Sequence, residues 1–180
     1  MREFIMLLFV LVALAVPVAA LASGTPTATS TANQICKLAQ TSMGATLFAQ
    51  TYATNASKAD AFGKCVSKNA ATAKQDVSNA SKTCTSQQAD PNFAATHGGK
   101  TFEQFYGNNT SKGKGSAANA FGKCVSQAVS KSVAAQAKTL TTAAKSCKAA
   151  LKASATDFAA KYGTGRDAFG KCVAATSKTK

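Results

Sequence analysis

Two long stretches of the chain carry apolar or small residues at every third or fourth position. The first runs from Ala61 to about Gln88, and its pattern comprises Phe62, Val66, Asn69, Ala73, Val77, Ala80 and Cys84. The second runs from Ala120 to about Ala153, and its pattern comprises Phe121, Val125, Ala128, Val133, Leu140, Ala144, Cys147 and Leu151. A spacing of three to four residues places side chains on one face of an α-helix. The pattern therefore predicts two long helices, each with an apolar face made narrow by its alanines.

Both predicted helices begin with the same heptapeptide, AFGKCVS, at 61–67 and 120–126, and a close copy, AFGKCVA, occupies 168–174. A side chain that can cap a helix directly precedes each copy, namely Asp60, Asn119 and Asp167. Because Asp and Asn at this position accept hydrogen bonds from free backbone N–H groups, we expect these three residues to be helix N-caps. The Phe, Cys and Val of each copy then lie on one side of the first helical turns.

Upstream of each heptapeptide lies a Phe-x-x-x-Tyr pair, whose spacing places both rings on one face of a short helix. Gly follows the Tyr in the second and third copies, where it suits a helix C-cap. One further cysteine precedes each pair, which gives three units near 36–67, 84–126 and 147–174. We expect each unit to form a small core at its junction, and the core residues are Phe48, Tyr52, Phe62, Val66, Phe102, Tyr106, Phe121, Val125, Phe158, Tyr162, Phe169 and Val173.

The six cysteines are expected to form three disulfides, for which fifteen pairings exist in principle. Two cysteines of one long helix lie about 28 Å or more apart at ~1.5 Å per residue, so they cannot pair with each other. Helical geometry and the repeat favour bonds from the cysteine that ends one helix to the cysteine that opens the next. This pairing is Cys36–Cys65, Cys84–Cys124 and Cys147–Cys172. In the chain-entropy model each such bond contributes on the order of 3–4 kcal/mol.

Large apolar residues are scarce in this chain. Leu, Ile, Val and Phe make up only about 12% of it from Ser23 onward, against the roughly 20% below which a highly charged chain is usually disordered. Strong helix formers and disulfides offset this deficit. The sequence thus predicts an all-α, extended helical repeat protein with disulfide-stapled helix–helix junctions. Residues 85–118, which include Pro91 and a glycine-rich loop, are expected to be its most irregular part.

The N-terminal residues are typical of a secretory signal peptide. Arg2 precedes an apolar run, and the sequence ALA at 20–22 supplies a small-x-small cleavage site. We expect a signal peptide over 1–22, a flexible Ser/Thr/Pro linker over 23–31 and the repeat region over 32–180. The alternative is an apolar run retained as an anchor. No later segment is apolar enough to cross a membrane, and a secreted, extracellular protein fits the expected disulfides.

The motifs FEQFYG…NAFGKCVS and DFAAKYG…DAFGKCVA resemble repeats in uncharacterised secreted proteins of actinobacteria, in which F-x-x-x-YG and NAFGKCV recur. The resemblance covers most of the chain from Cys36 to Ala174. The first copy departs from it, because Ala53 stands where the other copies have Gly. That family has no known activity, so the resemblance implies export and a repeat architecture but no particular function.

A net charge of +14 in a chain of 18.3 kDa favours contact with polyanions, such as acidic polymers or anionic surfaces. The lysines are spread along the predicted helices and the aromatic residues occupy core positions, so no specific nucleic-acid site is expected. Lys64, Lys123 and Lys171 recur directly before a cysteine and are candidate anion contacts. The leading hypothesis is a secreted, non-enzymatic protein with a binding or structural role at anionic envelope or extracellular polymers. A cationic membrane-active effector is the first alternative.

An enzyme is the second alternative, and it would depend on His97, the one histidine of the chain, with Glu103 as the nearest carboxylate in sequence. The chain carries no GxSxG, HExxH or phosphate-binding glycine-rich motif. It also lacks the Cys-x-x-Cys spacing of common metal sites. Because Asp60 and Asp167 are already assigned as helix caps, few carboxylates remain for paired acid–base chemistry. We therefore expect no catalytic, cofactor-binding or metal-binding residues.

Overall fold

The computed structural model describes residues 24–107 and 119–178, and in these two ranges every regular element is an α-helix. The predicted signal peptide and most of the loop before Asn119 lie outside the described residues. The helices are α1 (Ala28–Met43), α2 (Ala45–Tyr52), α3 (Ala61–Gln88), α4 (Phe93–Thr96), α5 (Phe102–Tyr106), α6 (Ala120–Ala153), α7 (Ala155–Tyr162) and α8 (Ala168–Lys178). The all-α prediction is confirmed, and α3 and α6 match the two long helices predicted from the apolar pattern.

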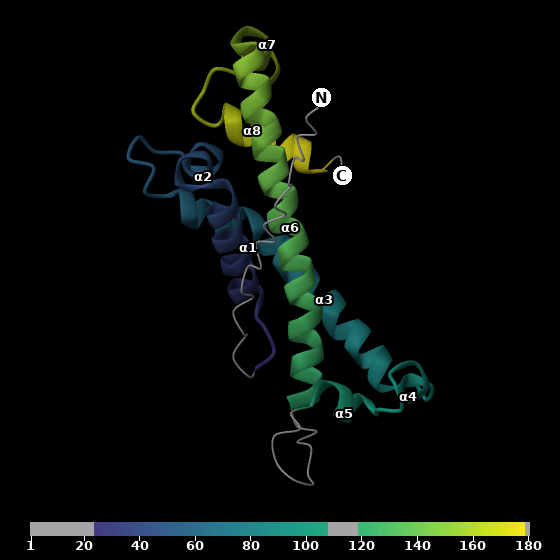
Figure 1. Ribbon diagram of the computed structural model, residues 1–180. Helices are drawn as coiled ribbons and strands as arrows, with labels where there is room; N and C mark the ends of the chain where they lie inside the picture. Colours follow the sequence, from purple (N-terminus) through teal and green to yellow (C-terminus); the bar gives the residue numbers. More distant parts are fainter. Residues whose placement is uncertain (1–23, 108–118, 179–180) are drawn as a thin grey trace, which may run out of the picture.

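The molecule is elongated, and α6 runs along its length (Figure 1). This helix has 34 residues, which corresponds to about 51 Å at ~1.5 Å per residue. Helix α3 crosses α6, and α1 packs against both of them. The short helices gather at the two ends: α7 and α8 lie near the end of α6, whereas α4 and α5 lie near its start (Figure 1). Of the region expected to be irregular, the described part, 85–107, is helical at the end of α3 and in α4 and α5.

The three predicted disulfides, Cys36–Cys65, Cys84–Cys124 and Cys147–Cys172, are present. The Cys36–Cys65 bond joins the middle of α1 to the first turns of α3. The other two bonds join the C-terminal part of one helix to the first turns of a later one, and the Cα atoms of all three pairs lie 5.9–6.0 Å apart. All six cysteines are buried. The repeated heptapeptide is therefore a covalent attachment point at each helix–helix junction.

The prediction of a flexible linker over 23–31 is wrong at its C-terminal end, because α1 already begins at Ala28. Thr27 caps this helix, and its side chain and that of Ser30 form a reciprocal capping box. Thr31 is fully buried in the first turn of the helix. The serines and threonines that suggested a linker instead form the start of α1.

The assignment of Asp60 and Asn119 as side-chain caps is also wrong. Both stand at the N-cap position, but neither side chain makes a capping hydrogen bond. Their backbones are near-helical, with ψ of −6° and −3°, whereas a capping side chain needs an extended backbone to reach the N–H groups. The Asp60 carboxylate instead accepts hydrogen bonds from the backbone and hydroxyl of Thr54. The Asp167 carboxylate forms an ion pair with Lys171 Nζ at 3.0 Å.

The buried side chains form two clusters rather than one small core per unit. The first cluster combines the junctions of the first and third units, and it includes Phe48, Phe158 and Phe169. The second surrounds the junction of the second unit. Of the predicted core residues, Phe48, Tyr52, Phe102, Val125, Phe158, Phe169 and Val173 are buried. The other predicted core residues are partly buried against a cluster: Phe62, Val66, Tyr106, Phe121 and Tyr162.

The first and third units meet where α8 packs against α2. Gly170, the glycine of the third heptapeptide, makes this approach possible. A Cβ atom at this position would lie 2.5 Å from the carbonyl oxygen of Thr51 at the end of α2. The contact is with backbone, so a larger residue at this position requires one helix to move. This glycine therefore fixes how closely α8 lies against α2.

Candidate binding site

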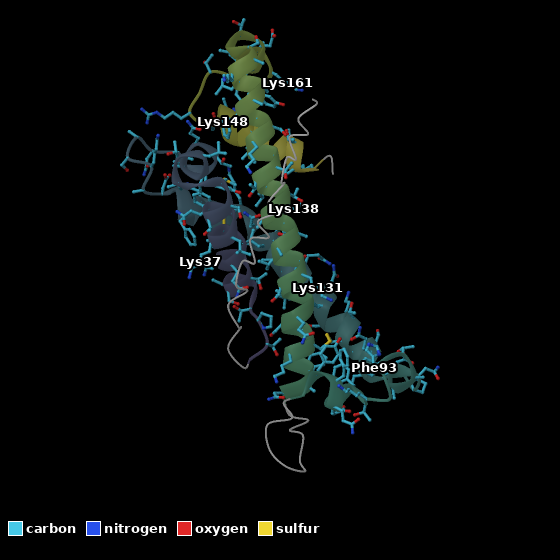
Figure 2. All side chains as sticks on the ribbon, in the orientation of Figure 1. Lys37, Phe93, Lys131, Lys138, Lys148 and Lys161 are labelled. Atoms are coloured by element: carbon cyan, nitrogen blue, oxygen red, sulfur yellow. A yellow bond between two sulfur atoms is a disulfide. The ribbon has the colours of Figure 1, made fainter. Side chains whose placement is uncertain are left out.

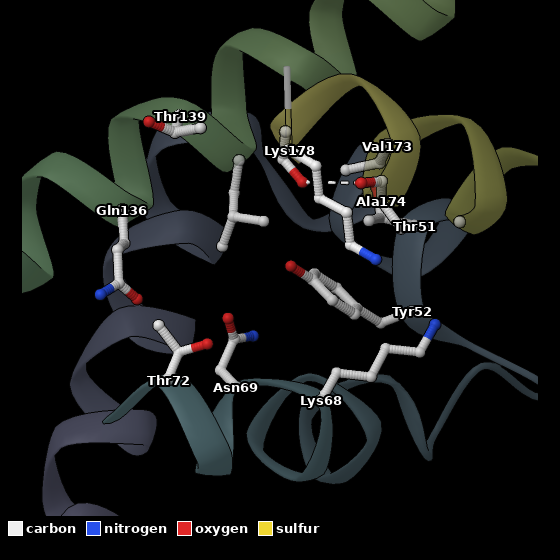
Figure 3. Close-up of a pocket in the computed structure, with 13 residues that line it drawn as sticks. Thr51, Tyr52, Lys68, Asn69, Thr72, Gln136, Thr139, Val173, Ala174 and Lys178 are labelled. Carbon is white, nitrogen blue, oxygen red and sulfur yellow. Dashed lines mark hydrogen bonds between the residues drawn. The ribbon is translucent and has the colours of Figure 1, made fainter. Parts of the chain in front are cut away.

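A cavity of about 330 Å³ lies where α2, α3, α6 and α8 meet (Figure 3). Its walls come from the first and third units and from the long helices beside them, and they include Tyr52 of α2, Asn69 of α3, Gln136 of α6 and Ser177 of α8. The volume is at the lower end of the roughly 300–1,000 Å³ that small-molecule sites occupy. The cavity exists because the third unit folds back against the first.

Tyr52 is the central polar group of this cavity. Its side chain is only 4% exposed, and its hydroxyl is buried without a hydrogen-bond partner. Figure 3 shows the ring lying across the cavity, with the hydroxyl toward the side where Asn69 and Thr72 stand. Burial raises the pKa of the Tyr52 phenol to about 12, and a longer hydrogen-bonding interaction with the Asn69 side chain, beyond 3.5 Å, opposes this rise in part. The hydroxyl thus remains protonated at neutral pH and can donate a hydrogen bond.

Amide and hydroxyl groups surround the Tyr52 ring, and several of them are already held in place. Asn69 Nδ2 donates to the carbonyl oxygen of Cys65 at 2.9 Å, which leaves its Oδ1 as an acceptor. Gln136 Nε2 donates to the carboxylate of Asp76, and the Ser177 hydroxyl donates to the Ala174 carbonyl oxygen at 3.1 Å. Intrahelical and interhelical bonds therefore orient these groups before any ligand arrives.

Two lysines give the cavity its charge. Lys68 Nζ lies 6.0 Å from the centroid of the Tyr52 ring, and Figure 3 shows Lys178 extending over the same ring. Both ammonium groups lie away from the Tyr52 hydroxyl, toward the other end of the ring (Figure 3). No Asp or Glu is among the described residues that line the cavity. The cavity is thus positive at one end and offers neutral donors and acceptors at the other.

The lysines predicted as anion contacts do not take part in this cavity. Lys64, Lys123 and Lys171 lie in the first turns of α3, α6 and α8, respectively. Lys64 is exposed, and Lys171 is held in the ion pair with Asp167. That ion pair lowers the pKa of the Asp167 carboxyl below its usual value.

Sequence reasoning missed Lys68, Lys178 and the role of Tyr52. The apolar pattern of the first long helix did contain one signal, since Asn69 stands in it as a polar residue among alanines and valines. Tyr52 shares its motif position with Tyr106 and Tyr162, and the one local difference, Ala53 in place of Gly, does not indicate a binding role. Tyr106 Oη donates to Gln87 Oε1 at 2.9 Å, whereas the Tyr52 hydroxyl is left without a partner.

His97 stands in an aromatic cluster at the α4–α5 end of the molecule, near the labelled Phe93 (Figure 2). Its ring stacks on Phe93 with the ring centroids 3.7 Å apart, and its Nδ1 lies 2.9 Å from the Phe93 carbonyl oxygen. Phe105 packs edge-on against the same ring and is itself 44% exposed. The contacts that hold His97 are thus aromatic rings, the Phe93 carbonyl oxygen and the Thr96 hydroxyl at 2.9 Å, and Glu103 is not among them. In the described ranges, no group of His, Cys, Asp and Glu residues is arranged to hold a metal ion.

Exposed lysines line the outside of the molecule along its whole length. Figure 2 labels Lys131, Lys138 and Lys148 on α6, Lys161 on α7 and Lys37 on α1, and all five are exposed. In the described part of the chain, no helix combines the length and apolarity that a membrane span requires. The positive charge is therefore distributed along the molecule rather than concentrated in one groove.

Comparison of the chain with protein-family models, with curated proteins and with solved structures finds no match.

Proposed function

We propose that this protein is a secreted, non-enzymatic binding protein that attaches to anionic polymers of the cell envelope or its surroundings. The observation that carries the proposal is the spread of exposed lysines along α1, α6 and α7, in a chain with a net charge of +14. A flexible polyanion can follow an elongated basic surface and make many weak contacts at once. Each contact releases counterions, so the affinity rises with the number of lysines engaged.

The test is binding of the purified, disulfide-bonded protein to an immobilised anionic polysaccharide across a salt series. We expect binding at low salt that weakens steeply as salt rises, because screening and counterion competition both increase. Immobilised neutral dextran serves as the control for attachment unrelated to charge.

A variant with Lys131, Lys138 and Lys148 replaced by Gln tests the surface itself. These residues are exposed on α6, so their replacement leaves the buried clusters intact. We expect a shallower dependence of affinity on salt, by about one unit of log–log slope per lysine that contacts the polymer. Binding that persists unchanged in this variant, or no binding even at low salt, contradicts the proposal.

The membrane-active alternative has less support in the fold. Apart from the exposed Leu151, the large apolar residues of α3 and α6 pack in or against the two clusters, so insertion into a bilayer would require these helices to leave their packing. Leakage of a dye from anionic vesicles in the same salt series distinguishes the two functions. A protein that only binds anionic polymers is expected to leave the vesicles intact.

A further inference from the structure

The cavity at the meeting of α2, α3, α6 and α8 contains a buried donor with no acceptor. A buried hydroxyl without a close partner is unfavourable, and Tyr52 is only 4% exposed, with no hydrogen-bond partner within 3.5 Å of its hydroxyl. The repeat offers an internal comparison, since the equivalent Tyr106 satisfies its hydroxyl with Gln87. Tyr52 has only the longer interaction with Asn69, so its hydroxyl, unlike that of Tyr106, retains the capacity to donate to a ligand.

The lining determines what kind of ligand fits. At the hydroxyl end of the Tyr52 ring, Asn69 and Thr72 offer an amide and a second hydroxyl to groups that both donate and accept hydrogen bonds (Figure 3). At the other end, Lys68 and Lys178 favour a negative charge. Between them, the Tyr52 ring and the methyl groups of Val173 and its neighbours supply apolar contact. A hydroxylated molecule of sugar size with an anionic group at one end matches this arrangement of polar, apolar and positively charged groups.

We propose that the cavity binds a single hydroxylated, anionic unit, with its negative group at Lys68 and Lys178 and a hydroxyl oxygen accepting from Tyr52. The choice of an acidic unit rests on the proposed function, in which the protein meets anionic polymers. The cavity then recognises one unit of such a polymer, while the exposed lysines supply affinity without selectivity. Sugar acids and polyol phosphates share this chemistry, and the experiment separates them.

The test titrates the purified, disulfide-bonded protein with glucuronate, glycerol 3-phosphate or glucose, followed by two-dimensional NMR of the backbone amides. We expect saturable binding of at least one charged probe, with shifts in α2, α3 and α8. Glucuronate alone would identify a sugar acid, and glycerol 3-phosphate alone would identify a polyol phosphate. Either result supports the site. Saturable binding of neither charged probe, or binding of glucose as tight as theirs, overturns the proposal.

Two variants assign the binding to the cavity. Tyr52→Phe removes only the hydroxyl, and we expect the bound probe to bind roughly three- to tenfold more weakly, as loss of one hydrogen bond predicts. Tyr162→Phe is the matched control, because this residue has the same motif position and does not line the cavity. Lys68→Gln provides an independent variant if Tyr52→Phe is poorly folded. Unchanged affinity in both Tyr52→Phe and Lys68→Gln overturns the proposal.

The salt-series experiment on immobilised polymer is run on the same variants. Failure of the cavity proposal can then be distinguished from failure of the proposed polymer binding. Loss of probe binding in Tyr52→Phe with salt-sensitive polymer binding retained supports the cavity as a selective site beside the basic surface. Probe binding in a protein that does not bind any anionic polymer removes the proposed function and leaves the cavity with a free small molecule as its ligand.

Discussion

The glycine of the repeated AFGKC motif has a different environment in each of its three copies. A Cβ added at Gly63 meets nothing within 4 Å, and one added at Gly122 makes an ordinary contact with Thr25 at 3.7 Å. Of the three positions, only Gly170 would place the added Cβ closer than van der Waals contact allows, at 2.5 Å from the Thr51 carbonyl oxygen. Identical glycines in a repeat thus differ in the space available for a side chain, and that space is set by the segment packed against each of them.

Replacement of Gly170 by Ala is therefore expected to lower the free energy of unfolding by about 1–3 kcal/mol, since α8 must move away from α2. The matched variant Gly63→Ala is expected to be neutral or up to about 1 kcal/mol more stable, because Ala has the higher helix propensity. Urea denaturation of both variants without reducing agent measures the difference. Equal effects at the two positions would show that α8 does not approach α2 as closely as described.

At the level of helices, the disulfides compensate for narrow apolar faces. Helices α3 and α6 bury chiefly alanine, valine and cysteine, and small side chains remove little apolar surface from water. The cysteines stand where each long helix begins and ends. The disulfides thus hold the helices in contact at positions where little apolar surface is buried between them.

Removal of the Cys84–Cys124 bond, by replacing both residues with Ala, is expected to lower the free energy of unfolding by on the order of 4 kcal/mol. The estimate follows from the sequence separation of 40 residues between the two cysteines in the chain-entropy model. Urea denaturation of the double variant beside the intact protein measures the loss. If the loss is below about 1 kcal/mol, helix packing rather than the disulfide holds this junction.

Helix positions could be predicted from the sequence where the pattern that indicates them is local. Helix caps and helix starts that depend on backbone conformation could not. The period of the apolar residues located α3 and α6. The distance between cysteines within one helix excluded intrahelical bonds, and the repeat favoured the pairing that is present. The expected caps at Asp60 and Asn119 failed because capping depends on the backbone conformation of the cap residue, which its identity does not determine. The predicted linker was wrong because the specific positions of Thr27 and Ser30 form a capping box at a helix start. A Ser/Thr-rich composition does not reveal those positions.

Over the whole molecule, the principal departure from the sequence prediction is that the units are not arranged in a line. The first and third share one buried cluster, and α8 packs on α2. A repeat pattern shows that units are similar but carries no information about which of them touch. The cavity around Tyr52 depends on this long-range contact, and it was therefore absent from the candidate sites drawn from the sequence.

A double-mutant cycle tests the shared cluster. Phe48→Leu and Phe169→Leu lie in the first and third units but in one cluster, so we expect their effects on the free energy of unfolding to be coupled by roughly 0.5 kcal/mol or more. Phe48→Leu and Phe102→Leu lie in different clusters, and we expect their effects to add within roughly 0.3–0.5 kcal/mol. Additivity in both pairs would indicate three independent units.

The order of the disulfides along the chain also has a mechanical consequence. In a protein pulled from its two ends, tension follows the shortest covalent path, and here that path crosses from Cys36 to Cys65, from Cys84 to Cys124 and from Cys147 to Cys172. Between these crossings it runs only along α3 and α6. The bypassed segments cannot be stretched while the bonds are closed, although each of their residues could otherwise extend by about 3.3–3.6 Å. Under tension the oxidised chain can therefore extend only through α3, α6 and its two ends, and reduction of the disulfides releases the bypassed segments.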